Sequence, residues 1–550
     1  MATTLFGFQL ASRDDPLANV RSVRAWSARL PRNDPVGAVE VIIELLEAAV
    51  GASPQPVSTH RTQAILELDR IAIPLQEQLR GQYRTNALSD EVRQRLWQAC
   101  DGLARWFVHA YHEIAAALLA DGDQRKGRVA LDGVFARLFH YIGVQTRQGL
   151  FRYEQWIPGR WRQLHDAYRD ACEQGVAAEA YAPDPARNEQ RTPEQEYVQI
   201  LLLQLLNTGN LSAQQIDWAD EWLHGWAPQL RLAMTSLEGA GYWLDLGRGE
   251  GLLGRRPQQI AGELLYLDVE PLRAELEALM ARLHAQASEN PGQGELDEQL
   301  GLARQLDRLW QPHAPEQPRR GERRTVGYPV AVAVGWAAIT AALATKFATK
   351  SRAPPGYHYD DYGRLQPDKE VGKSAAELRR ADAAAWHIHD SSDSGFRIRS
   401  STPQASRQRP GALLVLQLED HPRWQVGIVR RLKRLGAGAT ELGVEIISRN
   451  AALIIPREVG VGESGYSVDG VDIGNKNKSF HALYLPPPPN ARANAAPSLV
   501  LPPAEFTRGR MLSLLVDGQH HEVCLGAPLE RAKDWIWSAI EGSAGHANER

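Results

Sequence analysis

The spacing of apolar residues changes once along this 550-residue chain, and that change constrains the fold more than any other feature. Up to about residue 310, apolar residues recur every three or four positions, which is the spacing of amphipathic helices. After about residue 325 they come in short blocks or alternate with polar residues, which is the pattern of strands. The sequence therefore predicts an α+β multidomain protein with an all-α first part and a β-rich second part.

The first part, residues 1–310, reads as a helical bundle or irregular helical array, with room for two subdomains. Two helix starts are marked by capping residues. Ser89 precedes acidic residues, and Thr192 with Gln195 has the spacing of a capping box. The clearest helical segments are 38–50, 62–83, 89–119, 129–149 and 156–172. The histidines of this region lack a zinc-binding spacing, so we expect structural roles for them and no metal site; they are His109, His112 and His140.

Two short motifs carry the chemistry of the second part. The first is a run of arginines in a proline-rich linker, residues 311–324, and it contains R-x-x-x-R in two overlapping frames. Guanidinium groups are well suited to bidentate contacts with phosphate and to stacking on bases. The second motif reads D-x-S-x-x-G. The residues of the two motifs are Arg319, Arg320, Arg323 and Arg324, and then Asp390, Ser392 and Gly395.

This ordered pair of motifs, followed by strands, resembles the PilZ family of bacterial cyclic di-GMP receptors, whose signature is RxxxR followed by [D/N]xSxxG. The strands expected after the motifs are 411–418, 424–431 and 442–447. The resemblance implies a PilZ-like antiparallel β-barrel over residues 325–485. It also implies cyclic di-GMP as the ligand, with no cofactor.

The resemblance further implies a role for each motif residue. The arginines would lie on an arm before the first strand and clamp the phosphates and guanines. Asp390 would accept hydrogen bonds from guanine N–H groups, and Ser392 would reach a phosphate or the backbone. Gly395 would permit a turn that a Cβ hinders. The mechanism would be binding without bond cleavage.

The spacing of the motifs departs from the family pattern, because 67 residues separate Arg323 from Asp390. We therefore expect an insertion near residues 337–385, looped out of the barrel. Beyond the barrel we expect a Pro/Ala linker at 486–497 and a C-terminal β-extension with a helix at 498–550. Within that last region the helix is expected at residues 530–540.

Composition excludes several classes of protein. A net charge of −4 argues against a nucleic-acid polymer as partner. Three cysteines without a pairable pattern fit a reducing compartment, and the N-terminus lacks a signal-peptide pattern. The most apolar stretch, 328–343, is shorter than the roughly 20 residues of a membrane span. We therefore expect a cytoplasmic protein without stable membrane insertion.

Three functions remain open at this stage. The leading one is a cyclic di-GMP receptor that transmits ligand binding to an unidentified protein partner through its helical region. The alternative is a PilZ-like scaffold or adaptor that binds a protein but no nucleotide. A remote alternative is an S-adenosylmethionine-dependent methyltransferase, suggested by the glycine-rich segment 242–251. No catalytic motif is present, so we expect no enzyme.

Overall fold

The structure is a computed structural model, and it divides into two compact units, residues 1–317 and 318–550. It describes residues 15–31, 33–51, 58–84, 88–120, 124–156, 158–184, 189–206, 209–235, 241–254, 262–289, 294–310, 324–348, 357–359, 365–367, 386–402, 405, 408–418, 424–435, 438–459, 480–487, 496–516 and 519–542. Each unit is described below by itself.

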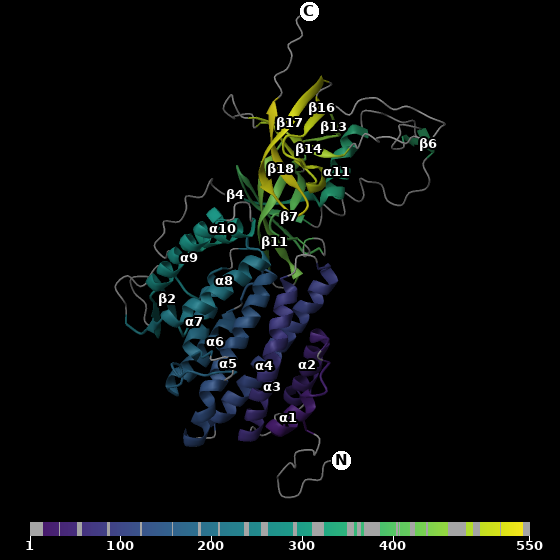
Figure 1. The fold of residues 1–550 in the computed structure, drawn as a ribbon. Helices are drawn as coiled ribbons and strands as arrows, with labels where there is room; N and C mark the ends of the chain where they lie inside the picture. Colours follow the sequence, from purple (N-terminus) through teal and green to yellow (C-terminus); the bar gives the residue numbers. More distant parts are fainter. Residues whose placement is uncertain are drawn as a thin grey trace, which may run out of the picture. The chain divides into compact units, whose positions relative to one another are not determined.

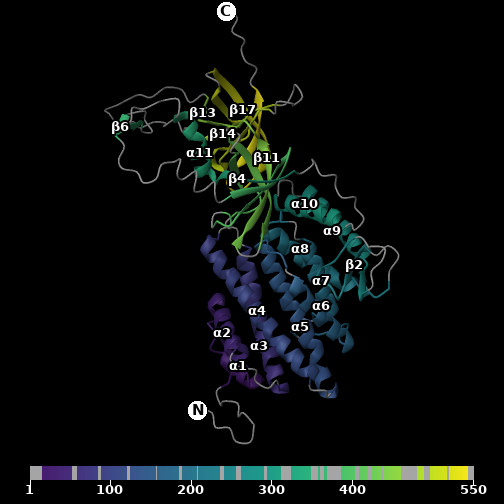
Figure 2. The same cartoon turned by 180° about the vertical axis from the view of Figure 1, so that it is seen from behind.

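The first unit is built from long helices that run side by side in both views (Figures 1 and 2). The expected helical segments are confirmed, and so are the Ser89 cap and the Thr192–Gln195 capping box. The helices are α1 (Val20–Ser27), α2 (Pro35–Gly51), α3 (Thr59–Tyr83), α4 (Asp90–Ala120), α5 (Gln124–Phe151), α6 (Pro158–Glu173), α7 (Pro193–Leu205), α8 (Ala213–Trp226), α9 (Glu270–Glu289) and α10 (Gly294–Leu309), with a 3-10 turn at Ala227–Gln229.

One hydrophobic core runs through this unit from Leu17 to Trp310. The aromatic residues of α4 and α5 lie inside it: Phe107, Tyr111, Phe139 and Tyr141 are fully buried. The rings of Phe107, Tyr111 and Tyr141 stack on one another, with the Phe107 and Tyr141 centroids 4.5 Å apart, and Phe139 stacks on Phe135. These aromatic stretches are therefore packing residues of the helical unit.

The glycine-rich segment lies in a small antiparallel sheet rather than a nucleotide-binding fold. The strands β1 (Leu232–Ala233), β2 (Tyr242–Asp245) and β3 (Leu264–Leu267) have the order β1-β3-β2. A doubly wound fold needs parallel strands joined through helices, so the methyltransferase interpretation is not favoured. The glycines serve close packing instead, because a Cβ at Gly251 would lie 2.6 Å from the Trp161 ring.

The second unit contains the expected antiparallel barrel, which closes in the order β10-β11-β8-β7-β4-β9. Its strands are β4 (Arg324–Val334), β7 (Trp386–Ser392), β8 (Gly395–Ser400), β9 (Leu413–Leu418), β10 (Gln425–Arg434) and β11 (Thr440–Ser448). Between β4 and β7 the chain forms α11 (Trp336–Ala348) and a hairpin of β5 (Tyr357–Tyr359) and β6 (Leu365–Pro367). None of these three elements belongs to the barrel sheet.

The inserted helix α11 packs against the barrel and is not simply looped out of it. Ile339 and Leu343 of α11 are 0% and 4% exposed, and they share a core with Val415 and Ile428 of the barrel. The apolar stretch 328–343 is thus the end of β4 followed by α11. Among the helices that the structure describes, we find none with the length and apolar character needed to cross a membrane.

The barrel expected over residues 325–485 ends earlier than predicted. After Ser448 the chain enters a separate seven-stranded antiparallel sheet of order β12-β14-β15-β18-β17-β16-β13. Its strands are β12 (Ala452–Ile454), β13 (Arg457–Glu458), β14 (Ala482–Leu485), β15 (Ser498–Leu501), β16 (Met511–Val516), β17 (Gln519–Arg531) and β18 (Ile536–Gly542), with a 3-10 turn at Pro503–Glu505. The strands β12 and β14 find their partners there because the barrel closes without them and offers no free edge.

The prediction of a helix at residues 530–540 is wrong, because this segment forms the end of β17 and most of β18. Ile536, Ser538 and Ile540 are buried, while Trp537 and Ala539 between them are partly exposed. That alternation is the period of a strand. The alanine and charged residues of the segment favoured a helix locally, but pairing with β15 and β17 overrides that preference.

The end of β17 and the turn that follows it make three polar contacts with β10 and with the segment just before β9. Trp535 donates from Nε1 to the Gly411 carbonyl at 3.0 Å. Arg430 of β10 binds both carboxylate oxygens of Glu530, at 2.6 and 2.8 Å. Arg409 forms an ion pair with Asp534 at 2.5 Å. The barrel and the second sheet therefore make one compact unit.

Candidate functional site

The barrel brings the two sequence motifs together through the antiparallel pairing of β4 with β7. Arg324, the first residue of β4, lies opposite Ser391, and Thr325 lies opposite Asp390. The other three arginines of the run, Arg319, Arg320 and Arg323, lie outside the described residues. The end of the arginine run is thus adjacent to the D-x-S-x-x-G segment, although 66 residues separate Arg324 from Asp390 in the sequence.

Both strands are irregular at this point. The register of β7 with β8 shifts between Ile388 and Asp390, and the register of β4 with β7 shifts between Thr325 and Tyr328. A bulge adds a residue to one strand and changes the direction of the neighbouring side chains. Both shifts fall between Ile388 and Asp390 of β7, directly before Asp390, where a bulge affects the direction of its side chain.

Asp390 is 4% exposed, and its carboxylate forms an ion pair with Arg397, which stands directly opposite on β8. Arg397 also lies 3.8 Å from Glu441, whose other oxygen accepts from Arg399 at 2.7 Å. The Arg397 Nε is buried and has no hydrogen-bond partner among the described residues. The predicted guanine acceptor is therefore part of a charged cluster, in which Arg397 retains an unused N–H donor.

The turn after Asp390 is held tightly. Ser392 Oγ donates to the Gly395 carbonyl at 3.3 Å, and the Ile446 N–H donates to the Ser394 carbonyl at 2.9 Å. Arg449 donates to the Asp393 carbonyl at 2.9 Å. Ser392 thus uses its hydroxyl within the turn and is only partly buried, so the turn positions it near the barrel surface.

Gly395 is required by crowding rather than by an unusual backbone angle. A Cβ at this position would lie 2.0 Å from the Val444 carbonyl oxygen of β11. No side chain tolerates such an approach without moving the backbone. The glycine of the motif therefore lets β8 and β11 pair closely directly after the turn.

Several of the other basic residues of the barrel serve structural ion pairs. Arg430 bridges Glu530 and Glu445, and its hydrogen bond with Glu530 is the main reason that its pKa is raised. Arg409 pairs with Asp534. These two residues contribute to the stability of the fold, so part of the barrel's positive charge is neutralised by carboxylates of the same unit.

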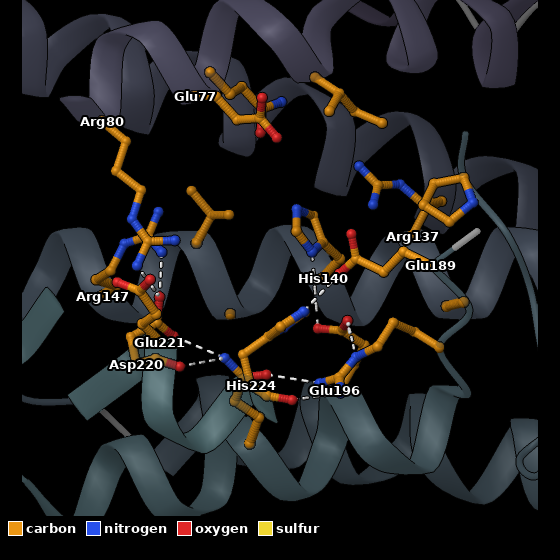
Figure 3. Close-up of a pocket in the computed structure, with 18 of the residues that line it drawn as sticks. Glu77, Arg80, Arg137, His140, Arg147, Glu189, Glu196, Asp220, Glu221 and His224 are labelled. Carbon is orange, nitrogen blue, oxygen red and sulfur yellow. Dashed lines mark hydrogen bonds and ion pairs between the residues drawn. The ribbon is translucent and has the colours of Figure 1, made fainter. Parts of the chain in front are cut away.

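The helical unit contains a charged cavity of about 460 Å³ that was not predicted from the sequence. Figure 3 shows side chains that enter it from helices on opposite sides. The sequence pattern that could have predicted this cavity is a stripe of polar residues at helical spacing on helices that are otherwise apolar. Its clearest members are Glu77 and Arg80 on α3, Arg84 at the C-cap of α3, His140 and Arg147 on α5, and Asp220, Glu221 and His224 on α8.

The described residues contain no cluster of three or more His, Cys, Asp or Glu side chains that could hold a metal ion. His112 and His140 both have a lowered pKa, mainly because burial disfavours the charged ring. The three cysteines are unpaired. The barrel site is thus built from arginines, a carboxylate, a serine and backbone groups.

Comparison with known families agrees with this architecture. A family model described as the cyclic-di-GMP receptor FimW, N-terminal domain, matches residues 21–236. A second, described as the cyclic-di-GMP receptor FimW, middle PilZ domain, matches residues 345–452. Together they cover more than half of the chain, although the PilZ match begins after the arginine run. No curated protein matches the chain.

Proposed function

Because this chain belongs to the family of the cyclic di-GMP receptor FimW, we propose that it binds cyclic di-GMP at the two-motif end of its PilZ barrel. We include in this proposal that the protein works in the cytoplasm and transmits ligand binding to a protein partner through its helical unit. The function is recognition, without a bond being made or broken.

One observation carries the ligand site: Arg324 pairs across the sheet with Ser391, next to Asp390. An extended chain spans at most about 3.6 Å per residue, so Arg319 is within about 18 Å of Arg324. The other three arginines precede Arg324 by at most five residues, so the chain allows them to reach the D-x-S-x-x-G turn. Such a set of guanidinium forks suits a ligand with two phosphates and two planar guanines.

The geometry supports a division of roles within the site. The arginines supply charge and stacking surfaces, while Asp390 is the carboxylate that guanine N–H groups can approach. Arg397 forms an ion pair with that carboxylate. Ser392 and Gly395 fix the turn that presents it.

Isothermal titration calorimetry with cyclic di-GMP tests the ligand. We expect saturable binding by the intact protein, lost or weakened at least about tenfold in Arg323→Ala and in Asp390→Ala. Arg508→Ala is the matched control, because Arg508 is an exposed arginine between β15 and β16 and belongs to neither motif. Linear pGpG controls for nonspecific attraction of nucleotides. Absence of heat with folded protein overturns the proposal and favours the nucleotide-free adaptor.

Transmission to a partner is tested by hydrogen exchange of the intact protein with and without cyclic di-GMP. We expect changed protection in helices of the first unit as well as at the barrel motif. Changes confined to β4, β7 and β8 would contradict transmission through the helical unit while leaving ligand binding intact.

A further inference from the structure

The cavity in the helical unit lies between α3 and α5 on one side and α7 and α8 on the other (Figure 3), and Tyr181, Asp184 and Glu189 also line it. All of its lining residues belong to this one unit. Its volume of about 460 Å³ exceeds that of a few water molecules, each of which takes about 30 Å³ in the liquid. It is large enough for a small metabolite.

Three guanidinium groups gather at one end of the cavity. Arg80 belongs to α3, Arg84 caps the C-terminus of that helix, and Arg147 belongs to α5. They are close enough to repel one another: the pKa of Arg80 is lowered chiefly by burial, and then by the charges of Arg147 and Arg84. Protein structures rarely place cations so close unless anions balance them.

The balancing carboxylates belong to α8. Asp217 accepts from Arg80 Nε at 2.7 Å and also from Arg84. Asp220 accepts from Arg147, and from the Gln199 amide at 2.8 Å. Each of these two carboxylates already serves several donors.

The guanidinium groups, in contrast, retain donors. A guanidinium carries five N–H groups in a planar fork. The contacts of Arg147 within the described residues use Nη1, and its Nε is buried without a hydrogen-bond partner. Arg80 uses Nε and Nη2. This end of the cavity therefore has more donors than acceptors, and an anionic oxygen ligand would correct that imbalance.

His140 stands in the middle of the cavity in Figure 3, with its Nδ1 3.8 Å from Glu196. Burial lowers its pKa, and the charge of Arg137 adds to that effect. The neutral ring offers one donor and one acceptor, as a ligand hydroxyl requires.

Acidic groups on the wall limit the charge of the ligand. Glu189 pairs with His224 at 2.6 Å, and Glu221 pairs with Arg84 at 2.8 Å. Glu77 and Asp184 also line the cavity. A ligand that is anionic throughout would meet these carboxylates, whereas hydroxyl groups can donate to them.

We propose that this cavity binds a small hydroxyl-bearing anion, of the sugar-phosphate or hydroxy-acid class, with its anionic group held by Arg80, Arg84 and Arg147. The phosphate or carboxylate lies at the arginine end, and the hydroxyl groups reach His140 and the acidic wall. The site is separate from the nucleotide site proposed for the barrel and does not depend on it.

Substituting a glycine that lines the cavity would fill the proposed site without removing any charged side chain. Gly81 lines the cavity, and a Cβ placed there would meet no atom within 4 Å. Gly81→Leu therefore introduces a bulky side chain into open space, and leucine favours a helix more than glycine does. Gly301 of α10 is the matched control, since it too is an open helical glycine but does not line the cavity.

A second variant addresses the charge. Arg80→Gln removes one guanidinium, while Asp217 keeps its ion pair with Arg84. Folding of each variant is checked by circular dichroism and by the midpoint of thermal unfolding without ligand.

The probes are ribose 5-phosphate, citrate and inorganic phosphate, titrated calorimetrically into the intact protein at constant ionic strength. The first two distinguish a phosphate from a carboxylate ligand, and inorganic phosphate tests whether hydroxyl groups are needed. We expect saturable binding of at least one hydroxyl-bearing probe, with a Kd below about 1 mM. Binding should weaken at least about tenfold in Gly81→Leu and in Arg80→Gln, and stay unchanged in Gly301→Leu and Arg323→Ala.

Two results would overturn the proposal: no saturable binding of either hydroxyl-bearing probe, or equal affinity in Gly81→Leu and the wild type. Loss of binding in Arg323→Ala alone would also overturn it, because the anion would then sit at the barrel motif. Cyclic di-GMP binding by Gly81→Leu is measured in parallel, so that failure of one site is distinguished from failure of the other.

Discussion

Asp390 and Arg397 face each other across β7 and β8, and their ion pair holds a carboxylate that is only 4% exposed. The residue that the PilZ resemblance assigns to guanine thus has a cationic partner within the barrel itself. Ligand recognition at this site has to share or displace that partner.

Replacing Arg397 with Gln should destabilise the second unit by about 1–3 kcal/mol, because the buried Asp390 carboxylate would lose its ion pair with Arg397. The double variant Asp390→Asn/Arg397→Gln should recover a large part of that loss. Chemical denaturation of the two single variants and the double variant measures the coupling. Simply additive losses would show that the two side chains do not stabilise each other.

Gly395→Ala should lower the free energy of unfolding by about 2 kcal/mol or more and abolish cyclic di-GMP binding, because its Cβ would lie 2.0 Å from the Val444 carbonyl. Gly327→Ala in the same barrel is the control for stability, since a Cβ there meets nothing within 4 Å. Equal stabilities of the two variants would contradict the crowding argument.

Glu67 should make the helical unit more stable at neutral pH than in acid. Its hydrogen bonds with Arg70, opposed by burial and aided by Arg24, lower its pKa from 4.5 to about 2. A depressed folded pKa stabilises the protein above pH 4.5, and that contribution is lost as the pH falls toward 2. Because Arg24 is largely exposed, we expect only about 1–2 kcal/mol. In Glu67→Gln, the free energy of unfolding of the helical unit should change less between pH 4.5 and about 2 than in the wild type. An unchanged pH dependence would contradict the stabilising role of the Glu67 carboxylate.

Ile339→Ala should cost about 2–5 kcal/mol in the second unit, because the fully buried side chain would leave a cavity in the core shared by α11 and the barrel. Leu529→Ala, at a residue 56% exposed, is the control and should change the free energy by less than about 0.5 kcal/mol. A small loss at Ile339 would mean that α11 is dispensable.

The sequence was sufficient to predict elements whose local pattern agrees with their surroundings. The long helices and the barrel strands follow directly from apolar spacing, and Thr192 and Ser89 cap their helices as expected. Asp390, Ser392 and Gly395 lie together on the β7–β8 turn because they are neighbours in sequence.

Long-range relationships could not be predicted in the same way. The segment containing Ile536 and Ile540 has helix-favouring neighbours, and only its pairing with β15 and β17 makes it a strand. The partner of Asp390 depends on the register of β7 with β8, which bulges alter. The cavity at Arg80 and Arg147 depends on how α3, α5, α7 and α8 are packed, and periodicity reveals only which faces are polar.

The core that Ile339 shares with Val415 and with Leu483 of the second sheet bears on how such a receptor can change during evolution. The barrel packs one apolar face against the second sheet. It therefore cannot be transferred alone by recombination, since that apolar face would become exposed to water. Trp535 and Glu530 would be lost with the neighbour, together with their contacts to Gly411 and Arg430. The barrel and the C-terminal sheet should therefore be inherited as a single block.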